Sequence, residues 1–264
     1  MSLPKTKIPV VETFFSIQGE GINIGKPYYF IRVGGCPLRC NFCDSEYTWK
    51  IDSIDSIIDV EELCSNAILY CQNVKCDWIS ITGGEPLLYP EQLLEMIRRF
   101  DSVGIKTHIE TSGRFYDIRV HQNCDLYSPD VKSPSTGECD ESYLKWIQNM
   151  RSKDQVKVLI ADQNDFDFAY QINKLLKDDC TLILQPFNEN VATDSITNMR
   201  EVKSQDRYKS KDVVPLHDLR YNLCSSLRDL IEMFLSSQRG GQKWFRTIVT
   251  PQIHVLAFGN KAGI

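Results

Sequence analysis

The chain has 264 residues, of which 30 are Lys or Arg and 35 are Asp or Glu, so its formal net charge is −5 at pH 7. A general nucleic-acid-binding protein needs a basic surface that neutralises phosphates, and this mildly acidic composition excludes that class. The length suits one large domain with an ample hydrophobic core, and we interpret residues 1–264 as a single domain.

The N-terminal residues have no apolar stretch of the kind found in secretory leaders, and no segment is long and apolar enough to cross a bilayer. The ten cysteines do not have the spacing of a disulfide framework. Both features predict a cytoplasmic protein in a reducing compartment. Seven cysteines are expected to be buried free thiols, namely Cys64, Cys71, Cys76, Cys124, Cys139, Cys180 and Cys224.

Short β-rich apolar runs alternate with segments of helical periodicity, which is typical of an α/β fold with a parallel sheet. Strands are predicted at residues 28–33, 77–82, 105–110, 124–131, 155–160, 181–186 and 246–254. Helices are predicted at residues 59–75, 90–100, 139–151, 165–177 and 218–237. Seven strands with crossover helices predict an incomplete barrel. The polar segment 188–216 is interpreted as a surface excursion, with a short helix around 195–204.

Three cysteines in a C-x3-C-x2-C arrangement, Cys36, Cys40 and Cys43, follow the first predicted strand and a Gly-Gly pair. Three thiolates can hold three irons of a four-iron cluster and leave the fourth iron open to a ligand. A zinc site is the alternative, because three cysteines with a fourth Cys or His also suit zinc. The nearest candidates, Cys64 and His108, lack a paired-ligand spacing, so the cluster is favoured over zinc and over accidental loop cysteines.

A second candidate site is the Gly83–Glu85 segment, which follows the strand predicted at 77–82. Two glycines and a carboxylate at a strand end expose backbone groups to a polar ligand. An ordinary strand-to-helix turn is the alternative, and the cysteine loop upstream favours the ligand site.

The C-x3-C-x2-C motif followed by Gly-Gly-Glu-Pro at 83–86 resembles the radical S-adenosylmethionine enzymes. That resemblance implies an incomplete (β/α)6-type parallel barrel and a [4Fe–4S] cluster bound by Cys36, Cys40 and Cys43. It implies that S-adenosylmethionine chelates the open iron and is cleaved to a 5′-deoxyadenosyl radical that abstracts a substrate hydrogen. Phe42 would lie near the adenine, whereas shielding of the cluster is its alternative role.

Further motifs narrow the resemblance: S-x-Q-G-E-G at 16–21, Arg32, and the segments 44–49, 110–113 and 128–132. Together with the cluster loop they resemble the 7-carboxy-7-deazaguanine synthase family of queuosine and deazapurine biosynthesis. The resemblance runs from about residue 8 to the carboxyl terminus, with 188–245 poorly matched. It implies a lyase that converts 6-carboxy-5,6,7,8-tetrahydropterin into 7-carboxy-7-deazaguanine with release of ammonia.

The resemblance also implies contacts to the substrate and to a magnesium ion. Arg32 is a fixed-charge fork that suits the pterin carboxylate, and a strand-end salt bridge is its alternative role. Ser45 would bind Mg²⁺ at a position where the family usually has Thr, and capping of a turn is its alternative role. The implied substrate contacts are Ile17, Gln18, Gly19, Arg32 and Thr82.

The implied cofactor contacts are Phe42, Cys43, Asp44, Gly84, Glu85, Glu110, Ser112, Ser128, Pro129, Asp130 and Gln185. Helix capping is the alternative for Glu110 and Ser112. At Asp130 the family usually has Lys, so either Lys132 supplies the cation or only the backbone contributes. His254 faces the pocket or is structural. No catalytic side chain is implied beyond the groups that hold the cluster and the cofactor.

The resemblance implies a flavodoxin or ferredoxin as electron donor, and a homodimer. It gives no role to nucleic acid or to a membrane. An activating enzyme that generates a glycyl radical on a protein partner is an alternative, because such enzymes share the cysteine spacing, but it would need neither S-x-Q-G-E-G nor an inward-facing Arg32. A non-catalytic metal-binding module is a third interpretation.

Overall fold

The computed structural model describes residues 4–41, 43–51, 56–187 and 216–252, and for 216–226 it describes the backbone alone. The short helix expected around 195–204, Phe42 and His254 therefore lie outside the described residues. The helices with described bounds are α1 (Val60–Val74), α2 (Pro90–Asp101), α3 (Ile118–Asn123), α4 (Gln163–Leu175) and α6 (Leu216–Arg239). The strands are β1 (Lys7–Ile17), β2 (Pro27–Val33), β3 (Ile57–Asp59), β4 (Trp78–Gly83), β5 (Lys106–Thr111), β6 (Leu126–Pro129), β7 (Gln155–Ile160), β8 (Thr181–Pro186) and β9 (Thr247–Val249).

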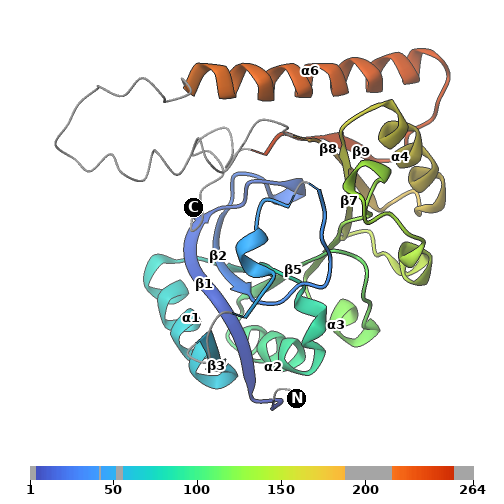
Figure 1. Ribbon diagram of the computed structural model, residues 1–264. Coiled ribbons are helices and arrows are strands. Elements are labelled where there is room, and N and C mark those ends of the chain that lie inside the picture. The colour runs from blue at the N-terminus through green and yellow to red at the C-terminus, as the bar shows by residue number, and fades with distance from the viewer. Residues whose placement is uncertain (1–3, 42, 52–55, 188–215, 253–264) are drawn as a thin grey trace, which may run out of the picture.

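The strands form a six-stranded sheet in the order β3-β1-β2-β4-β5-β6 and a three-stranded sheet in the order β7-β8-β9. Every neighbouring pair from β2 to β6 and from β7 to β9 is parallel. A parallel bridge between Asp130 and Lys157 joins the two sheets, so β2, β4, β5, β6, β7, β8 and β9 make an open barrel. Figure 1 shows the crossover helices on the outside of the strands and α6 running across the top. The predicted incomplete (β/α)6-type parallel barrel is confirmed.

Hydrophobic periodicity explains why the crossover helices cover the sheet. In α2, Leu93, Ile97 and Phe100 share one face and are buried in the core that lies between the helices and the strands. Pro90 occupies the first helical position, where its missing N–H costs nothing. No helix within the described ranges combines the length and the apolar character that crossing a membrane requires.

Two strands and two helices differ from the predictions, and one of these helices is α3, which was not predicted. β1 and β3 pair antiparallel at the edge of the sheet, and neither was predicted. The helix predicted at 139–151 is wrong, because that segment forms two short 3-10 turns, Ser142–Lys145 and Ile147–Asn149. Trp146 breaks the helix with φ −133°, and its buried indole donates to the Gly113 carbonyl at 2.8 Å. This tertiary hydrogen bond overrides the local helical periodicity.

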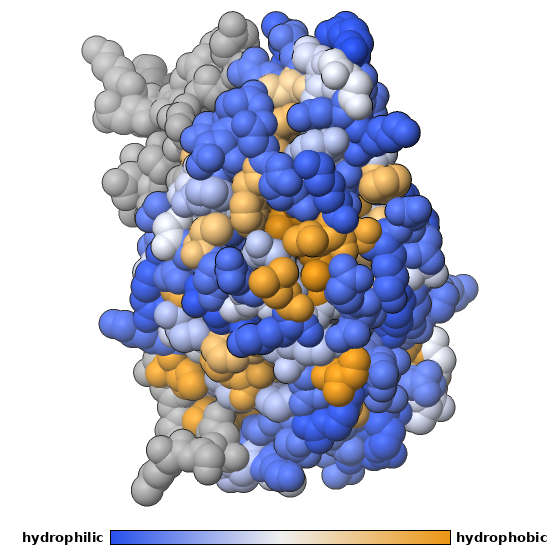
Figure 2. Space-filling model, turned by 90° about the vertical axis from the view of Figure 1, so that its right-hand side faces the viewer, coloured by the Kyte–Doolittle hydropathy of each residue, from blue (hydrophilic) through white to orange (hydrophobic). Residues whose placement is uncertain are grey.

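The described cysteines are free thiols. Five of those expected in the core are buried there, namely Cys64, Cys71, Cys76, Cys124 and Cys180. Cys139 is exposed, so the expectation is wrong at that position, which lies in a turn-rich segment after Gly137. The side chain of Cys224 lies outside the described residues. Figure 2 shows a face of the molecule that is largely hydrophilic, with hydrophobic residues gathered in a few groups between hydrophilic ones.

A fully buried carboxylate, Asp154, joins three elements at the opposite end of the barrel from the strand ends that carry the cluster loop. Its oxygens contact His121 Nε2 of α3 at 2.8 Å and Arg151 at 2.7 Å, and accept from the Tyr127 N–H of β6 at 3.1 Å. Burial alone would raise the pKa of Asp154, but hydrogen bonds from His121 and Arg151 outweigh burial and lower that pKa to about 2.

We expect Asp154→Asn to lower the free energy of unfolding at pH 7 by about 3 kcal/mol, because the partly buried Arg151 loses its counter-charge. An unfolded Asp has a pKa near 3.9, so the contribution of Asp154 is complete above about pH 5 and is lost as the pH falls toward 2. Urea unfolding of the cluster-free protein between pH 7 and pH 3 measures both effects. Exposed Asp178→Asn is the control, and a wild-type-to-variant difference that stays constant down to pH 3 would contradict this account.

Candidate functional site

A cavity of about 420 Å³ opens at the carboxyl ends of the parallel strands, where α/β barrels hold their reactive groups. It is lined by the loop after β1, the cysteine loop after β2, and the ends of β4, β5, β6 and β7. Of the predicted site residues, Ile17, Gln18, Gly19, Arg32, Cys36, Cys40, Cys43, Asp44, Ser45, Thr82, Gly84, Glu110, Ser112, Ser128 and Asp130 line this cavity. Glu85, Pro129 and Gln185 do not line it, and Phe42 lies outside the described residues.

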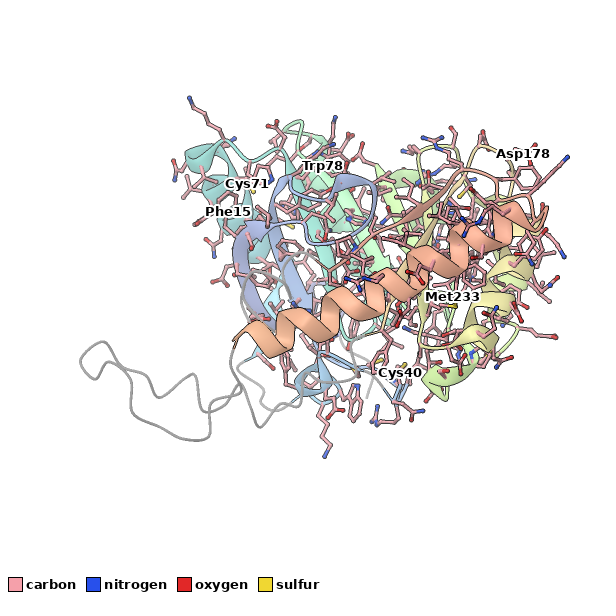
Figure 3. The ribbon with its side chains drawn as sticks, turned by 90° about the horizontal axis from the view of Figure 1, so that it is seen from above. Phe15, Cys40, Cys71, Trp78, Asp178 and Met233 are labelled. Atoms are coloured by element: carbon pink, nitrogen blue, oxygen red, sulfur yellow. The ribbon has the colours of Figure 1, made fainter. Side chains whose placement is uncertain are left out.

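Three thiols, those of Cys36, Cys40 and Cys43, face this cavity and are partly exposed. The two candidates for a fourth ligand do not line it: Cys64 is in the hydrophobic core and His108 is fully buried. Figure 3 shows Cys40 on a different side of the molecule from Cys71. Within the described ranges, no group of three or more His, Cys, Asp or Glu side chains is arranged as a site for a single metal ion. The donor set at the cavity, three thiols, fits a four-iron cluster with one open iron.

The thiols have to lose their protons before they bind iron. Burial raises the pKa of all three, and the Lys132 ammonium opposes this effect at Cys36 and Cys40. At Cys43, hydrogen bonds from Ser45 and Trp49 oppose the effect of burial. The site therefore contains groups, from the loop itself and from the segment after β6, that favour the thiolate form at each cysteine.

Close backbone contact between the end of β4 and the cysteine loop explains the two glycines of the Gly83–Glu85 segment. The N–H of Glu85 donates to the Gly35 carbonyl at 2.8 Å, and that of Gly84 donates to the Val33 carbonyl at 2.9 Å. A Cβ on Gly84 would collide with the Gly35 carbonyl oxygen, and Gly83 has a φ of +120°, which favours glycine. The expected close backbone approach is therefore present.

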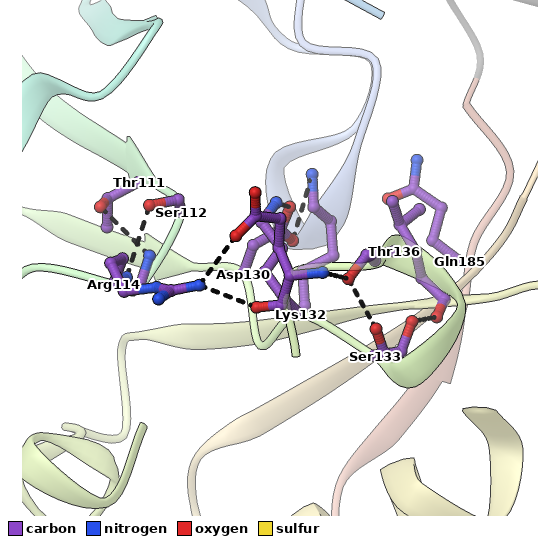
Figure 4. A network of polar contacts seen from close by, with 12 residues as sticks. Thr111, Ser112, Arg114, Asp130, Lys132, Ser133, Thr136 and Gln185 are labelled. Atoms are coloured by element: carbon purple, nitrogen blue, oxygen red, sulfur yellow. Dashed lines mark hydrogen bonds and ion pairs between the residues drawn. The ribbon is translucent and has the colours of Figure 1, made fainter. Parts of the chain in front are cut away.

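The Glu85 carboxylate is fully buried and links the end of β4 to the end of β5. It accepts from the Leu87 N–H at 2.8 Å, from Thr111 Oγ1 at 2.7 Å and from the Ser112 N–H at 2.9 Å, and it also contacts Ser112 Oγ. Within the Gly83–Glu85 segment, the backbone of Gly83 and Gly84 is therefore the part that lines the cavity and is available to a ligand. Figure 4 shows Thr111 and Ser112 within the polar network at these strand ends.

The polar residues after β1 form the part of the site predicted to contact the substrate. Gln18 Nε2 donates to Glu110 Oε1 at 3.0 Å, and Ser80 Oγ donates to the same oxygen at 2.5 Å. Glu110 therefore fixes Gln18, and the helix-capping interpretation of Glu110 is wrong. Ser112 binds Glu85 instead of capping a helix, so that alternative is wrong as well.

Arg32 lines the cavity and is held by neighbouring side chains. Its Nε donates to Glu12 Oε1 at 2.7 Å, and its guanidinium lies 5.5 Å from the Phe14 ring centroid and 5.9 Å from that of Tyr47. The strand-end salt bridge is therefore present. It uses one of five N–H groups of the guanidinium, which leaves the forked end chemically able to bind a carboxylate.

Two oxygen donors of the cysteine loop face the cavity next to Cys43. Ser45 Oγ donates to Asp44 Oδ1 at 3.0 Å, and the Ser45 side chain makes no capping hydrogen bond to the turn that follows it. The capping interpretation of Ser45 is therefore wrong. A hydroxyl beside a carboxylate suits Mg²⁺, which takes one or two protein oxygens and several waters.

Sequence reasoning missed the buried acid–base pair of Glu20 and Lys157. The Glu20 carboxylate accepts from Lys157 Nζ at 2.6 Å, from Gln185 Nε2 at 2.9 Å and from Gln252 Nε2 at 2.7 Å. It connects the loop after β1 to β7, to β8 and to the segment after β9. A lysine in the otherwise apolar run of 156–160 was the available signal, because lysine is almost never buried without a partner.

Comparisons with known proteins agree with this geometry. A family model described as "4Fe-4S single cluster domain" matches residues 17–131. A 7-carboxy-7-deazaguanine synthase of Koribacter versatilis is 32% identical over 62% of this chain and 70% of the relative. One of Methanocaldococcus jannaschii is 31% identical over 66% of this chain and 81% of the relative. The chain belongs to the 7-carboxy-7-deazaguanine synthase family.

Two solved structures are similar in fold to this family member. The crystal structure of QueE from Escherichia coli has a TM-score of 0.55 and 25% identity, and the match covers 74% of this chain and 91% of QueE. Streptococcus suis SuiB, with a TM-score of 0.50 and 12% identity over 84% of this chain and 48% of SuiB, shares the fold. The iron–sulfur interpretation is thus confirmed over zinc, and neither the glycyl-radical activating enzyme nor the non-catalytic module is favoured.

We expect Gly84→Ala to push the end of β4 away from Gly35, lower the stability of the cluster-free protein by about 2 kcal/mol and reduce the iron bound after reconstitution. Gly104→Ala is the control for adding a Cβ without a collision, because Gly104 has open space around it, although its φ of +76° itself disfavours alanine. That control carries only a backbone cost of about 1 kcal/mol. Iron and sulfide analysis with urea unfolding measures both effects, and wild-type iron content in Gly84→Ala would contradict the predicted contact.

Proposed function

We propose that this chain is a radical S-adenosylmethionine lyase that converts 6-carboxy-5,6,7,8-tetrahydropterin into 7-carboxy-7-deazaguanine and ammonia. The observation that carries the proposal is that one cavity is lined both by the three cluster thiols and by Gln18, Arg32 and Thr82. Family membership supports the same reaction. Alternative functions do not need both sets of residues in one cavity.

Each group of residues has a defined task in this proposal. When bound, the cluster and S-adenosylmethionine supply a 5′-deoxyadenosyl radical that abstracts a hydrogen from the substrate. Cys36, Cys40 and Cys43 hold the cluster, and the open backbone at Gly84 admits the methionine end of the cofactor. The remaining proposed cofactor contacts are Phe42, Asp44, Glu110, Ser112, Ser128 and Asp130.

The substrate half of the cavity holds and orients the pterin. Arg32 binds the carboxylate of the substrate, because a guanidinium fixed by Glu12 and two aromatic rings loses little entropy when it binds. Gln18 presents its amide to the pterin edge in an orientation set by Glu110. Ser45, with Asp44, holds the magnesium ion. Ile17, Gly19 and Thr82 complete the proposed substrate contacts.

Three residues predicted as cofactor contacts do not line this cavity, namely Glu85, Pro129 and Gln185. Glu85 and Gln185 are fully buried, and their side chains bond to Thr111, Ser112 and Glu20. We therefore propose that both act indirectly, by positioning the residues that line the cavity. On the strength of the resemblance, we also propose that flavodoxin or ferredoxin reduces the cluster. The protein is proposed to be a homodimer and to be located in the cytoplasm.

The direct test incubates anaerobically reconstituted, reduced protein with S-adenosylmethionine, Mg²⁺ and 6-carboxy-5,6,7,8-tetrahydropterin. We expect 7-carboxy-7-deazaguanine and 5′-deoxyadenosine, both identified by mass spectrometry. The amount of ammonia released should equal the amount of 7-carboxy-7-deazaguanine formed. A brown, cluster-containing protein that cleaves S-adenosylmethionine without deazaguanine product would overturn the proposed substrate and favour a protein substrate instead.

Arg32→Ala should lower kcat/KM for the pterin about 100-fold, or roughly 2.7 kcal/mol, the range for a lost hydrogen bond to a charged group. Uncoupled cleavage of S-adenosylmethionine should change less than about twofold, because the substrate carboxylate is not involved in it. Arg32→Lys should be intermediate, and Arg98→Ala on the surface of α2 is the control. Equal loss of both activities would show that Arg32 is structural.

A further inference from the structure

Four charged side chains of alternating sign form a chain along the cavity wall: Lys132, Asp130, Lys157 and Glu20. Lys132 Nζ lies 2.9 Å from Asp130 Oδ2, and Lys157 Nζ lies 3.6 Å from Asp130 Oδ1 and 2.6 Å from Glu20 Oε2. The exposed fraction of each side chain is between 12% and 18%. Such pairs are little screened by solvent, so their charges act strongly on neighbouring groups.

The two ends of this chain face different parts of the site. At one end, Glu20 also accepts from Gln185 and Gln252 and lies beside Gln18, with its own N–H donating to Gln18 Oε1 at 3.2 Å. At the other end, Lys132 lines the same cavity as Cys36 and Cys40, and its charge opposes the rise in the pKa of these thiols that burial causes. The positive end of the chain is therefore directed at the cluster loop.

Asp130 holds this positive end in place. Its carboxylate is shared by two ammonium groups, so Lys132, Asp130 and Lys157 together carry a net charge of +1. The Lys132 ammonium is paired with the Asp130 carboxylate at 2.9 Å, and a paired lysine keeps its positive charge at neutral pH. Figure 4 shows Asp130 and Lys132 within this polar network.

A fixed cation next to a cluster stabilises the state with more negative charge, which is the reduced state. Net charge and the surrounding hydrogen bonds are established determinants of iron–sulfur reduction potentials. We propose that Lys132, positioned by Asp130, raises the reduction potential of the cluster bound by Cys36, Cys40 and Cys43. This inference rests on the cluster of the proposed function but not on the identity of the substrate.

The test is a redox titration of the reconstituted holoenzyme without S-adenosylmethionine, followed by electron paramagnetic resonance. Lys132→Met should lower the ratio of reduced to oxidised cluster at a fixed potential about tenfold, a shift of about 59 mV to more negative potential. Asp130→Asn should shift the potential in the opposite direction, because it removes an anion and leaves both lysines charged. Lys132→Arg should restore the wild-type value, and exposed Lys145→Met is the control.

The pair of opposite shifts separates an electrostatic role from structural damage. If Lys132→Met and Asp130→Asn shift the potential in the same direction, or if Lys132→Met keeps the wild-type potential, the inference is overturned while the proposed function stands. If Lys132→Met does not retain its cluster, the positive shift in Asp130→Asn decides the question. Wild-type protein that binds no cluster would overturn both this inference and the proposed function.

Discussion

The site depends on one backbone junction, the contact between the end of β4 and the cysteine loop. The hydrogen bond from the Glu85 N–H to the Gly35 carbonyl is possible only because residues 83 and 84 have no Cβ to obstruct the approach. The buried Glu85 carboxylate extends the junction to β5 through Thr111 and Ser112. The thiols of the loop and the polar strand ends are thereby held around one cavity by main-chain geometry, which side-chain substitutions elsewhere do not readily disturb.

A second constraint is electrostatic, because the cavity buries several charges and neutralises nearly all of them in pairs. Arg32 pairs with Glu12, Lys157 with Glu20, and Asp130 with two lysines. Buried charges are costly unless they are paired and hydrogen-bonded, so these pairs keep charged groups available inside the barrel. Asp130 stands where the resemblance implies a lysine, and its carboxylate lies 2.9 Å from the ammonium of Lys132.

The strands that carry the site could be predicted because each is a compact apolar run that ends at a glycine or a polar motif. Strand β1 could not, because polar residues at 12, 13 and 16 interrupt its apolar run, most of its residues after Val10 are at least partly exposed, and its pairing with β3 joins Lys7 to the distant Asp59. The helix predicted at 139–151 failed for a similar reason, since a single tertiary hydrogen bond from Trp146 decides its conformation. Short-range periodicity contains no information about such contacts.

Motif spacing placed the cluster ligands and most of the cavity lining, but it could not reveal what each side chain binds. Glu85 and Gln185 are polar residues at strand ends, yet their side chains are buried in contacts that only the folded chain creates. Glu20 binds Lys157 and Gln252, which lie far from it in the sequence, so no local pattern connects the three residues. Such long-range polar pairs are the part of an active site that a single sequence leaves undetermined.

The central claim is that three protein thiolates leave one iron of the cluster open to the amino and carboxylate groups of S-adenosylmethionine. Electron–nuclear double resonance on the reduced protein with nitrogen-15-labelled S-adenosylmethionine tests it most directly. The account predicts a cluster signal that changes when the cofactor is added and shows magnetic coupling to the labelled amino nitrogen. A signal that is unaffected by the cofactor, with a fourth protein side chain bound to the cluster, would contradict it.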